Sequence, residues 1–219
     1  MTRIDRRQFI DAGLAAAGGL ALGARAADAQ TGAAQTAPPF RRNTTMTELT
    51  PMLEALAATQ PDAALAAKLR LYGQFVGSWD LDIEWHAPTG ATVRGAGEWH
   101  FSWVLEGRAV QDVWIFPSRR ARTVPPQPWA FYGSTFRWYE PAIDAWHIRY
   151  FEPTRPFEMR QLGRAVGADI VQVGEDHNGI RRRWRFVEIA ERSFRWLGDA
   201  SWDRGESWTR ELEMRARRA

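Results

Sequence analysis

Three polar side chains that could transfer protons or stabilise charge lie within apolar and aromatic stretches: Asp112, Tyr132 and Arg182. A buried polar group must be satisfied by protein, water or a ligand. A carboxylate deep in an apolar pocket also acquires a raised pKa, which suits a general acid or base. These residues are therefore the candidate catalytic set if the protein is an enzyme, and Asp112 could pair with Arg182 inside the fold.

Two histidines could also support proton transfer, because each lies two residues from another ionisable side chain. The pairs are Glu98 with His100 and His147 with Arg149, and residues two apart in a strand project to the same side. The surrounding alternation places both pairs on the face opposite the aromatic residues, so we expect them on the outside. No metal site and no cofactor are expected, although haem held by one of the four histidines stays open.

Composition narrows the class of protein. The 219 residues are 45% hydrophobic and 25% charged, which is typical of a globular chain. The absence of cysteine removes disulfides, thiolate-bound metals and thiol nucleophiles. The net charge of +3, from 29 basic and 26 acidic residues, is too small to indicate nucleic acid as a partner.

The first 29 residues resemble a twin-arginine export signal. Arg6 and Arg7 precede a mild Ala/Gly/Leu stretch over residues 12–24, and a small-residue cleavage site ends at Ala29. The apolar stretch is shorter than the roughly 20 residues that span a bilayer, so no transmembrane span is expected. The resemblance implies recognition of Arg6 and Arg7 by the twin-arginine machinery, cleavage after Ala29, and a periplasmic or secreted mature protein.

Three further regions follow the signal: a flexible linker over 30–45, a helical segment over 46–76 and a β domain over 77–219. The linker is rich in Ala, Thr and Pro and has no apolar periodicity. In the helical segment, one helix is predicted to begin at Thr50-Pro51 and a second near Pro61-Asp62.

From Trp79 onward the apolar period changes from 3.6 to 2, which predicts strands buried on one face. About ten such segments follow with mostly short connections, and none of these connections could hold a crossover helix. The predicted fold is therefore mainly β: an antiparallel meander barrel of about 8–10 strands, preceded by a short helical hairpin. The turn from Ser201 to Trp208 fits the pattern S-x-D-x-G-x-x-W, which predicts a structural hairpin.

The junction Gly77-Ser78-Trp79 resembles the G-x-W signature of lipocalins and related calycin barrels. The closest resemblance is to uncharacterised bacterial lipocalin-like domains, and it covers the chain from Gln74 to the C-terminus. It implies a barrel whose tryptophan plugs the closed end, with an arginine of the last strand packed over it. Arg210 is the candidate for that arginine. Asp80 after the tryptophan and the preceding helices depart from the usual lipocalin pattern.

The many aromatic residues on the predicted inner face suggest a cavity for a flat ligand, enclosed by Trp138, Trp146 and Trp184. The candidate ligand-binding residues are Trp114, Tyr132, Phe136, Trp138, Trp146, Tyr150, Gln161, Arg182, Trp184 and Trp196. The favoured function is binding of a small hydrophobic or aromatic molecule by an exported protein, without catalysis.

Two alternatives remain open. One is an enzyme on the same barrel, such as an isomerase, hydratase or lyase acting on a hydrophobic substrate. The other is a protein-interaction module that uses the proline-rich loop over residues 117–128 and has a dry, filled barrel.

Overall fold

The computed structural model describes residues 46–87, 90–127 and 129–219, so the predicted signal and linker lie outside the described residues. The strands of the barrel are β2 (Gly77–His86), β3 (Thr92–Val104), β4 (Ala109–Phe116), β5 (Phe131–Glu140), β6 (Ala145–Glu152), β7 (Phe157–Val166), β8 (Asp169–Asp176), β9 (Arg181–Ala190), β10 (Ser193–Ser201) and β11 (Thr209–Arg218). The remaining elements are α2 (Met46–Leu56), β1 (Ala57–Ala58), α3 (Ala66–Gly73) and the short 3-10 helix η1 (Pro141–Ile143). The barrel and α3 belong to a unit that runs from Leu53 to Ala219.

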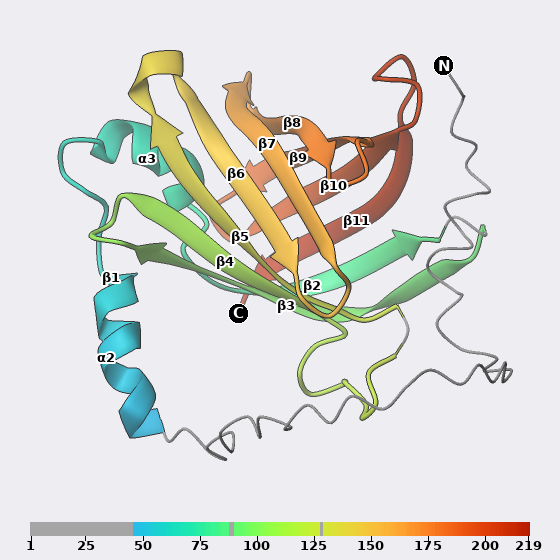
Figure 1. The fold of residues 1–219 in the computed structure, drawn as a ribbon, viewed down its shortest axis with the longest axis horizontal. Helices are drawn as coiled ribbons and strands as arrows, with labels where there is room; N and C mark the ends of the chain where they lie inside the picture. Colours follow the sequence, from blue (N-terminus) through green and yellow to red (C-terminus); the bar gives the residue numbers. More distant parts are fainter. Residues whose placement is uncertain (1–45, 88–89, 128) are drawn as a thin grey trace, which may run out of the picture. The chain divides into compact units, whose positions relative to one another are not determined.

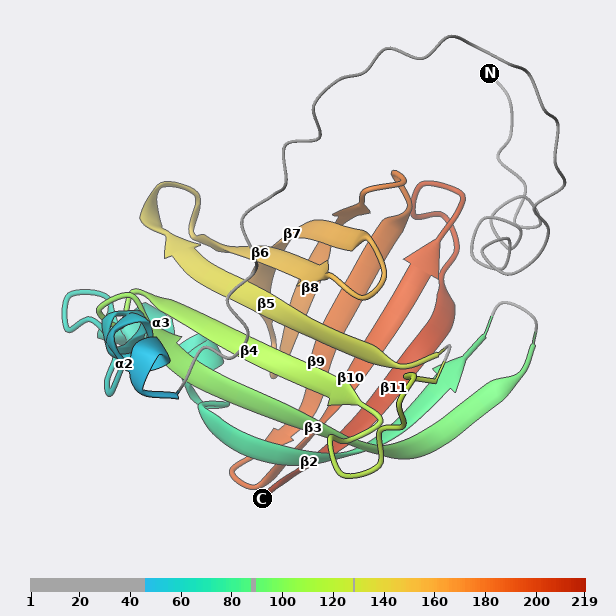
Figure 2. The ribbon, with the colours of Figure 1, turned by 60° about the horizontal axis from the view of Figure 1, so that its bottom comes forward.

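Strands β2 to β11 form a closed antiparallel barrel (Figure 1). Each strand pairs with its neighbour in the chain, β11 pairs with β2, and the ring is complete (Figure 2). The predicted fold class is confirmed. Strand β3 begins at Thr92, and Gly95 and Gly97 interrupt its apolar alternation without interrupting the strand.

Inside and outside positions alternate along the strands, as the period of two predicts. In β2, the buried side chains of Trp79, Leu81 and Ile83 alternate with the exposed Asp80 and Asp82. Full burial of such a side chain stabilises the fold by roughly 1.5–3 kcal/mol relative to an exposed position. The inner faces of the ten strands and α3 therefore make one continuous core.

Helix α3 and the segment after it cover the end of the barrel where β2 begins. Leu69, Tyr72 and Phe75 are fully buried there. The indole N–H of Trp79 donates a 2.7 Å hydrogen bond to the carbonyl oxygen of Phe75, which ties the first strand to the helical segment. This end is therefore closed by aromatic packing.

An arginine of the last strand packs over Trp79, but it is Arg218 and not the predicted Arg210. The Arg218 guanidinium lies 4.3 Å from the centre of a Trp79 ring and donates to the carbonyl oxygens of Gln74 and Val76. Strand register explains the difference, because Arg218 lies opposite Trp79 across β11 and β2. Arg210 lies near the other end of β11 and forms ion pairs with Asp199 and Glu213.

The helix starts differ from the predictions. Pro51 lies inside α2 and not at its start. The second helix begins at Ala66, because Asp62 accepts a hydrogen bond from the Ala64 N–H and holds residues 62–65 in a preceding turn. Within residues 46–87, 90–127 and 129–219, no helix has the length and apolar character needed to cross a membrane.

The predicted structural hairpin between β10 and β11 is confirmed. Asp203 accepts hydrogen bonds from the Ser201 hydroxyl and from the backbone N–H and hydroxyl of Ser207, and Gly205 adopts a φ of +101°. The hydrogen bonds from Ser207 and Ser201 hold the pKa of Asp203 well below its usual range. The turn is thus built around an ionised carboxylate.

Candidate ligand site inside the barrel

A polar cluster lies in the barrel interior, formed by Asp112 of β4 with Thr135 and Arg137 of β5. Asp112 lies opposite Thr135 across the two strands, and Arg137 follows two residues later on the same face. The Asp112 carboxylate forms an ion pair with the Arg137 guanidinium, and both side chains are fully buried. The predicted pair of Asp112 with Arg182 is therefore wrong.

The Arg137 guanidinium is surrounded by aromatic rings. Its central carbon lies 5.2 Å from the ring centre of Tyr72, 5.7 Å from Phe101 and 5.9 Å from Phe186. A guanidinium has five N–H donors, but Arg137 uses only its contact with Asp112 among the described residues. Arg137 Nε and Nη2, Asp112 Oδ1 and Thr135 Oγ1 are all buried without a hydrogen-bond partner there.

Four tryptophans and one tyrosine form an aromatic cluster beside these polar residues. The ring centres of Trp114 lie 5.7 Å from Trp99, 5.6 Å from Trp196 and 5.7 Å from Trp184. Tyr150 completes the cluster, 5.1 Å from Trp114 and 5.4 Å from Trp184. The indole N–H groups of Trp99, Trp114 and Trp196 are buried without a partner among the described residues.

A second set of unpartnered polar atoms belongs to Tyr72 of α3, Gln161 of β7 and Gln172 of β8. The Tyr72 hydroxyl, the side-chain oxygen of Gln161 and both polar atoms of the Gln172 amide have no hydrogen-bond partner in the described part of the chain. Tyr72 and Gln172 both lie over Gly163, since a Cβ there would be 2.4 Å from the Tyr72 hydroxyl and 3.3 Å from Gln172 Cγ. Burial raises the pKa of Tyr72, so its hydroxyl is a neutral group that can donate or accept.

Inward-facing glycines make room for the large rings. A Cβ on Gly133 would lie 2.3 Å from the hydroxyl of Tyr150, and one on Gly198 would lie 2.8 Å from the Trp196 ring. Large side chains from the neighbouring strand, as at Gly133, or from the same strand, as at Gly198, therefore fill positions that carry no side chain of their own. The barrel interior combines dense aromatic packing with polar atoms that lack partners.

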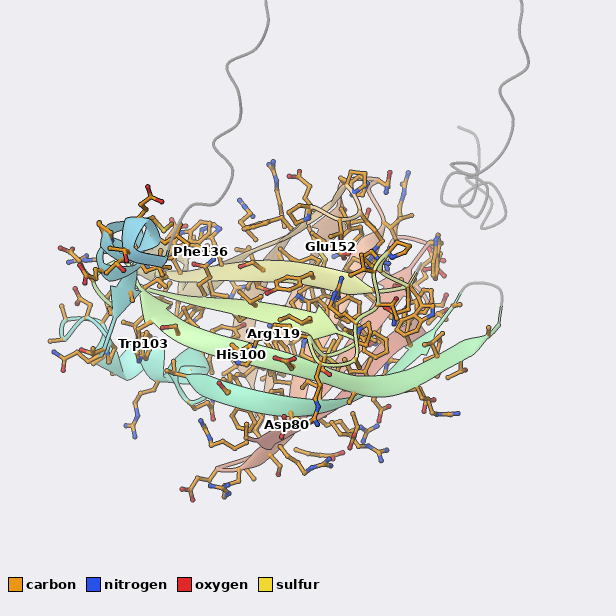
Figure 3. The ribbon with its side chains drawn as sticks, turned by 90° about the horizontal axis from the view of Figure 1, so that it is seen from below. Asp80, His100, Trp103, Arg119, Phe136 and Glu152 are labelled. Carbon is orange, nitrogen blue, oxygen red and sulfur yellow. The ribbon has the colours of Figure 1, made fainter. Side chains whose placement is uncertain are left out.

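Tyr132, Phe136 and Trp138 point outward, so the prediction that they face the barrel interior is wrong. Phe131, Gly133, Thr135, Arg137 and Tyr139 occupy the inner face of β5. The sequence predicted that Phe136 and Trp138 face inward, because an arginine such as Arg137 was not expected in the core. Figure 3 labels Phe136 on this strand.

Trp138 stacks on the outside against His147, with ring centres 4.9 Å apart, and the Arg149 guanidinium lies 5.6 Å from its ring. Trp146 does face inward, but it packs 4.7 Å from Tyr72. The predicted space enclosed by Trp138, Trp146 and Trp184 is therefore not present.

Arg182, Tyr150 and Glu152 lie toward the end of the barrel opposite α3. Arg182 forms ion pairs with Asp176 at 2.9 Å and with Glu211. The Tyr150 hydroxyl donates a 3.2 Å hydrogen bond to Glu152, and burial raises the pKa of Tyr150 well above its ordinary value. Each of these side chains already has a protein partner.

The two histidine pairs lie on the outer side of the barrel, as predicted. Glu98 and His100 are joined by a 3.1 Å contact, and Arg119 lies against both of them (Figure 3). His147 contacts Glu140. These groups are thus separated from the interior cluster by the barrel wall.

Sequence reasoning missed Thr135 and Arg137, although a signal was present. The small residues Gly133 and Thr135 alternate with large aromatic ones, and Gly133 marks an inner position where another ring needs space. Trp114, Gln161, Trp184 and Trp196 face inward as predicted. Their role in binding stays a prediction.

Comparisons with known proteins support the fold. No protein-family model matches the chain, and the search of curated proteins finds no match. The chain is similar to the crystal structure of Rv2717c from M. tuberculosis, with 12% sequence identity and a TM-score of 0.51. The match covers 70% of this chain and 98% of that chain. At this identity the likeness concerns the fold alone.

Proposed function

We infer that the barrel binds a small, flat, uncharged molecule that carries oxygen acceptors, with its polar end at Asp112, Thr135 and Arg137. The observation that carries this proposal is the set of buried polar atoms without hydrogen-bond partners among the described residues. An unsatisfied buried polar group destabilises a fold by about 1–3 kcal/mol. The number of unpartnered polar atoms in the barrel interior therefore supports a bound ligand that forms hydrogen bonds with them.

The chemistry of these atoms indicates the class of ligand. Indole and guanidinium N–H groups only donate, so the side chains of Trp99, Trp114, Trp196 and Arg137 cannot satisfy one another. Carbonyl or hydroxyl oxygens of a ligand can accept from them. The Asp112 carboxylate balances the charge of Arg137, which favours an uncharged ligand.

The same contacts weigh against the two alternatives. A catalytic carboxyl group must be free to reach a substrate, whereas the Asp112 carboxylate is held in a fully buried ion pair with Arg137. A dry, filled barrel would leave the indole N–H groups without partners. An aromatic ligand with oxygen acceptors accounts for the rings and for the unpartnered indole and guanidinium N–H groups.

Coumarin and naphthalene, which are bicyclic molecules of similar size, test the proposal. We expect coumarin to bind about tenfold more tightly, because its carbonyl oxygen accepts a hydrogen bond that naphthalene cannot make. Calorimetry gives the affinities. In NMR spectra, the indole N–H resonances of Trp99, Trp114 and Trp196 should shift on coumarin binding, with assignments from single Trp→Phe variants.

Trp79 provides the internal control, because its indole N–H already donates to Phe75 and should not shift. The Asp112→Leu/Arg137→Met double variant should lose the preference for coumarin. Equal binding of the two molecules, or no shift of the three indole resonances, would contradict a polar ligand site. Native mass spectrometry of protein isolated from its producing cells would reveal a ligand that copurifies.

We also propose that the protein is a lipocalin-like carrier exported through the twin-arginine route and cleaved after Ala29. The sequence from Arg6 to Ala29 supports this proposal. Replacing Arg6 and Arg7 with lysine in the full chain should prevent export while leaving the protein folded in the cytoplasm. Cell fractionation and N-terminal sequencing measure the outcome; unchanged export of the variant would contradict the proposed route.

A further inference from the structure

We propose a second binding site, for a small organic anion with an apolar body, in the groove between α3 and the adjoining ends of β5, β6 and β7. The groove has a volume of about 600 Å³. Helix α3 contributes Lys68, Arg70 and Leu71, and the strand side contributes Tyr139 and Arg164. This site is separate from the interior polar cluster and does not depend on the function proposed for it.

Positive charge exceeds negative charge in the groove. Lys68, Arg70 and Arg164 line it together with a single carboxylate, Asp144. The Lys68 ammonium forms a 2.7 Å ion pair with Asp144, which raises the pKa of Lys68 and keeps the amine protonated. One carboxylate therefore faces three cations.

Two of these cations form no ion pair among the described residues. Arg164 donates a 3.3 Å hydrogen bond to the backbone carbonyl of Ile143 and, after Lys68, helps to lower the pKa of Asp144, whereas Arg70 has no side-chain partner there. Their guanidinium groups remain available for an oxyanion, which a guanidinium can bind through two parallel hydrogen bonds.

The groove differs from the other arginine-rich part of the barrel. On the outer face of β9 to β11, Arg183, Arg185 and Arg210 all surround the carboxylate of Asp199 at 2.6–3.1 Å. The charges of those three arginines are therefore balanced in part by a carboxylate of the protein. The groove beside α3 instead combines a cavity with unneutralised positive charge.

Apolar and aromatic surface gives the groove its preference for an organic anion over an inorganic one. Leu71, Ala165 and the Tyr139 ring line it together with the edge of Trp146. The Tyr139 hydroxyl donates to Asp144, and the Lys68 ammonium lies 5.5 Å from the Tyr139 ring centre, so this ring is fixed in place. An apolar body can pack here while its anionic group reaches Arg70 and Arg164.

Cinnamate and cinnamyl alcohol test the proposal, because they share one skeleton and differ in the anionic group. We expect calorimetry on the full folded barrel to show cinnamate binding at least about tenfold more tightly than the alcohol. The Arg70→Gln/Arg164→Gln variant should weaken cinnamate binding by about tenfold or more and change alcohol binding by less than about twofold. Backbone-amide NMR shifts should lie in α3 and at the C-terminal ends of β5 and β7.

Arg120→Gln/Arg192→Gln is the matched control, since both arginines are exposed and neither lines the groove. This variant has the same net charge as the groove variant and should bind cinnamate like the unchanged protein. The proposal would be overturned if the unchanged protein and the Arg70→Gln/Arg164→Gln variant bound cinnamate with equal affinity. Equal affinity of the unchanged protein for cinnamate and cinnamyl alcohol would overturn it as well. Shifts of the Trp99, Trp114 and Trp196 indole resonances would place cinnamate in the interior and also overturn it, whereas failure of coumarin to bind would leave the groove result unaffected.

Discussion

Replacing Arg137 with methionine is expected to lower the free energy of unfolding by about 3–5 kcal/mol, because it leaves the charge of Asp112 buried without its partner. Both side chains of the pair are fully buried, so water cannot take the place of the guanidinium without opening the barrel. Urea unfolding followed by tryptophan fluorescence measures the change. This is one of the two largest effects that we expect from a single substitution.

The Asp112→Leu/Arg137→Met double variant separates folding from binding. Removing both charges together should restore most of the lost stability, since well-packed apolar residues commonly replace a buried pair without loss. If the pair anchors a ligand, this stable variant should still fail to distinguish coumarin from naphthalene. A double variant as unstable as Arg137→Met would show that the pair is needed for the fold itself, and unchanged stability of Arg137→Met would contradict the burial argument.

Replacing Trp79 with alanine is the second substitution with a large expected effect, a loss of about 3–5 kcal/mol in the free energy of unfolding. Trp79 is 1% exposed, contacts Phe75 and Phe194, and is covered by Arg218. Its removal opens a cavity at the closed end and also breaks the hydrogen bond to the Phe75 carbonyl. Urea unfolding again gives the magnitude.

Trp138→Ala is the matched control for Trp79→Ala, because Trp138 is stacked on the outer surface and not in the core. Its loss should lower the free energy of unfolding by less than about 1.5 kcal/mol. Similar losses for the two variants would mean that Trp79 does not hold the closed end of the barrel together.

The barrel could be predicted from the sequence because its signal is local. The alternation around Trp79 predicts the first strand, and most later segments repeat it between short connections. The hairpin at Asp203 was also predictable, since its hydrogen bonds join residues within one turn. Such features need no knowledge of distant contacts.

The interior site could be predicted only in part, because side-chain partners depend on strand register. The covering arginine proved to be Arg218 because β11 pairs with β2 so that Arg218 lies opposite Trp79. Both faces of β5 carry large residues. The face with Arg137 lies inside the barrel, where Arg137 forms an ion pair with Asp112 of the neighbouring strand β4. Within β5 itself, the small residues Gly133 and Thr135 are the local sign of the inner face, and they do not reveal the partner of Arg137.

The glycines that accommodate aromatic rings limit how this protein can evolve. A side chain at Gly133 would occupy the place of the Tyr150 ring, and one at Gly163 would meet the Tyr72 hydroxyl and Ile148. Mutation at either glycine becomes tolerable only after its large neighbour has been replaced by a smaller residue. In descendants of this chain, each glycine and its ring should therefore change together or remain together.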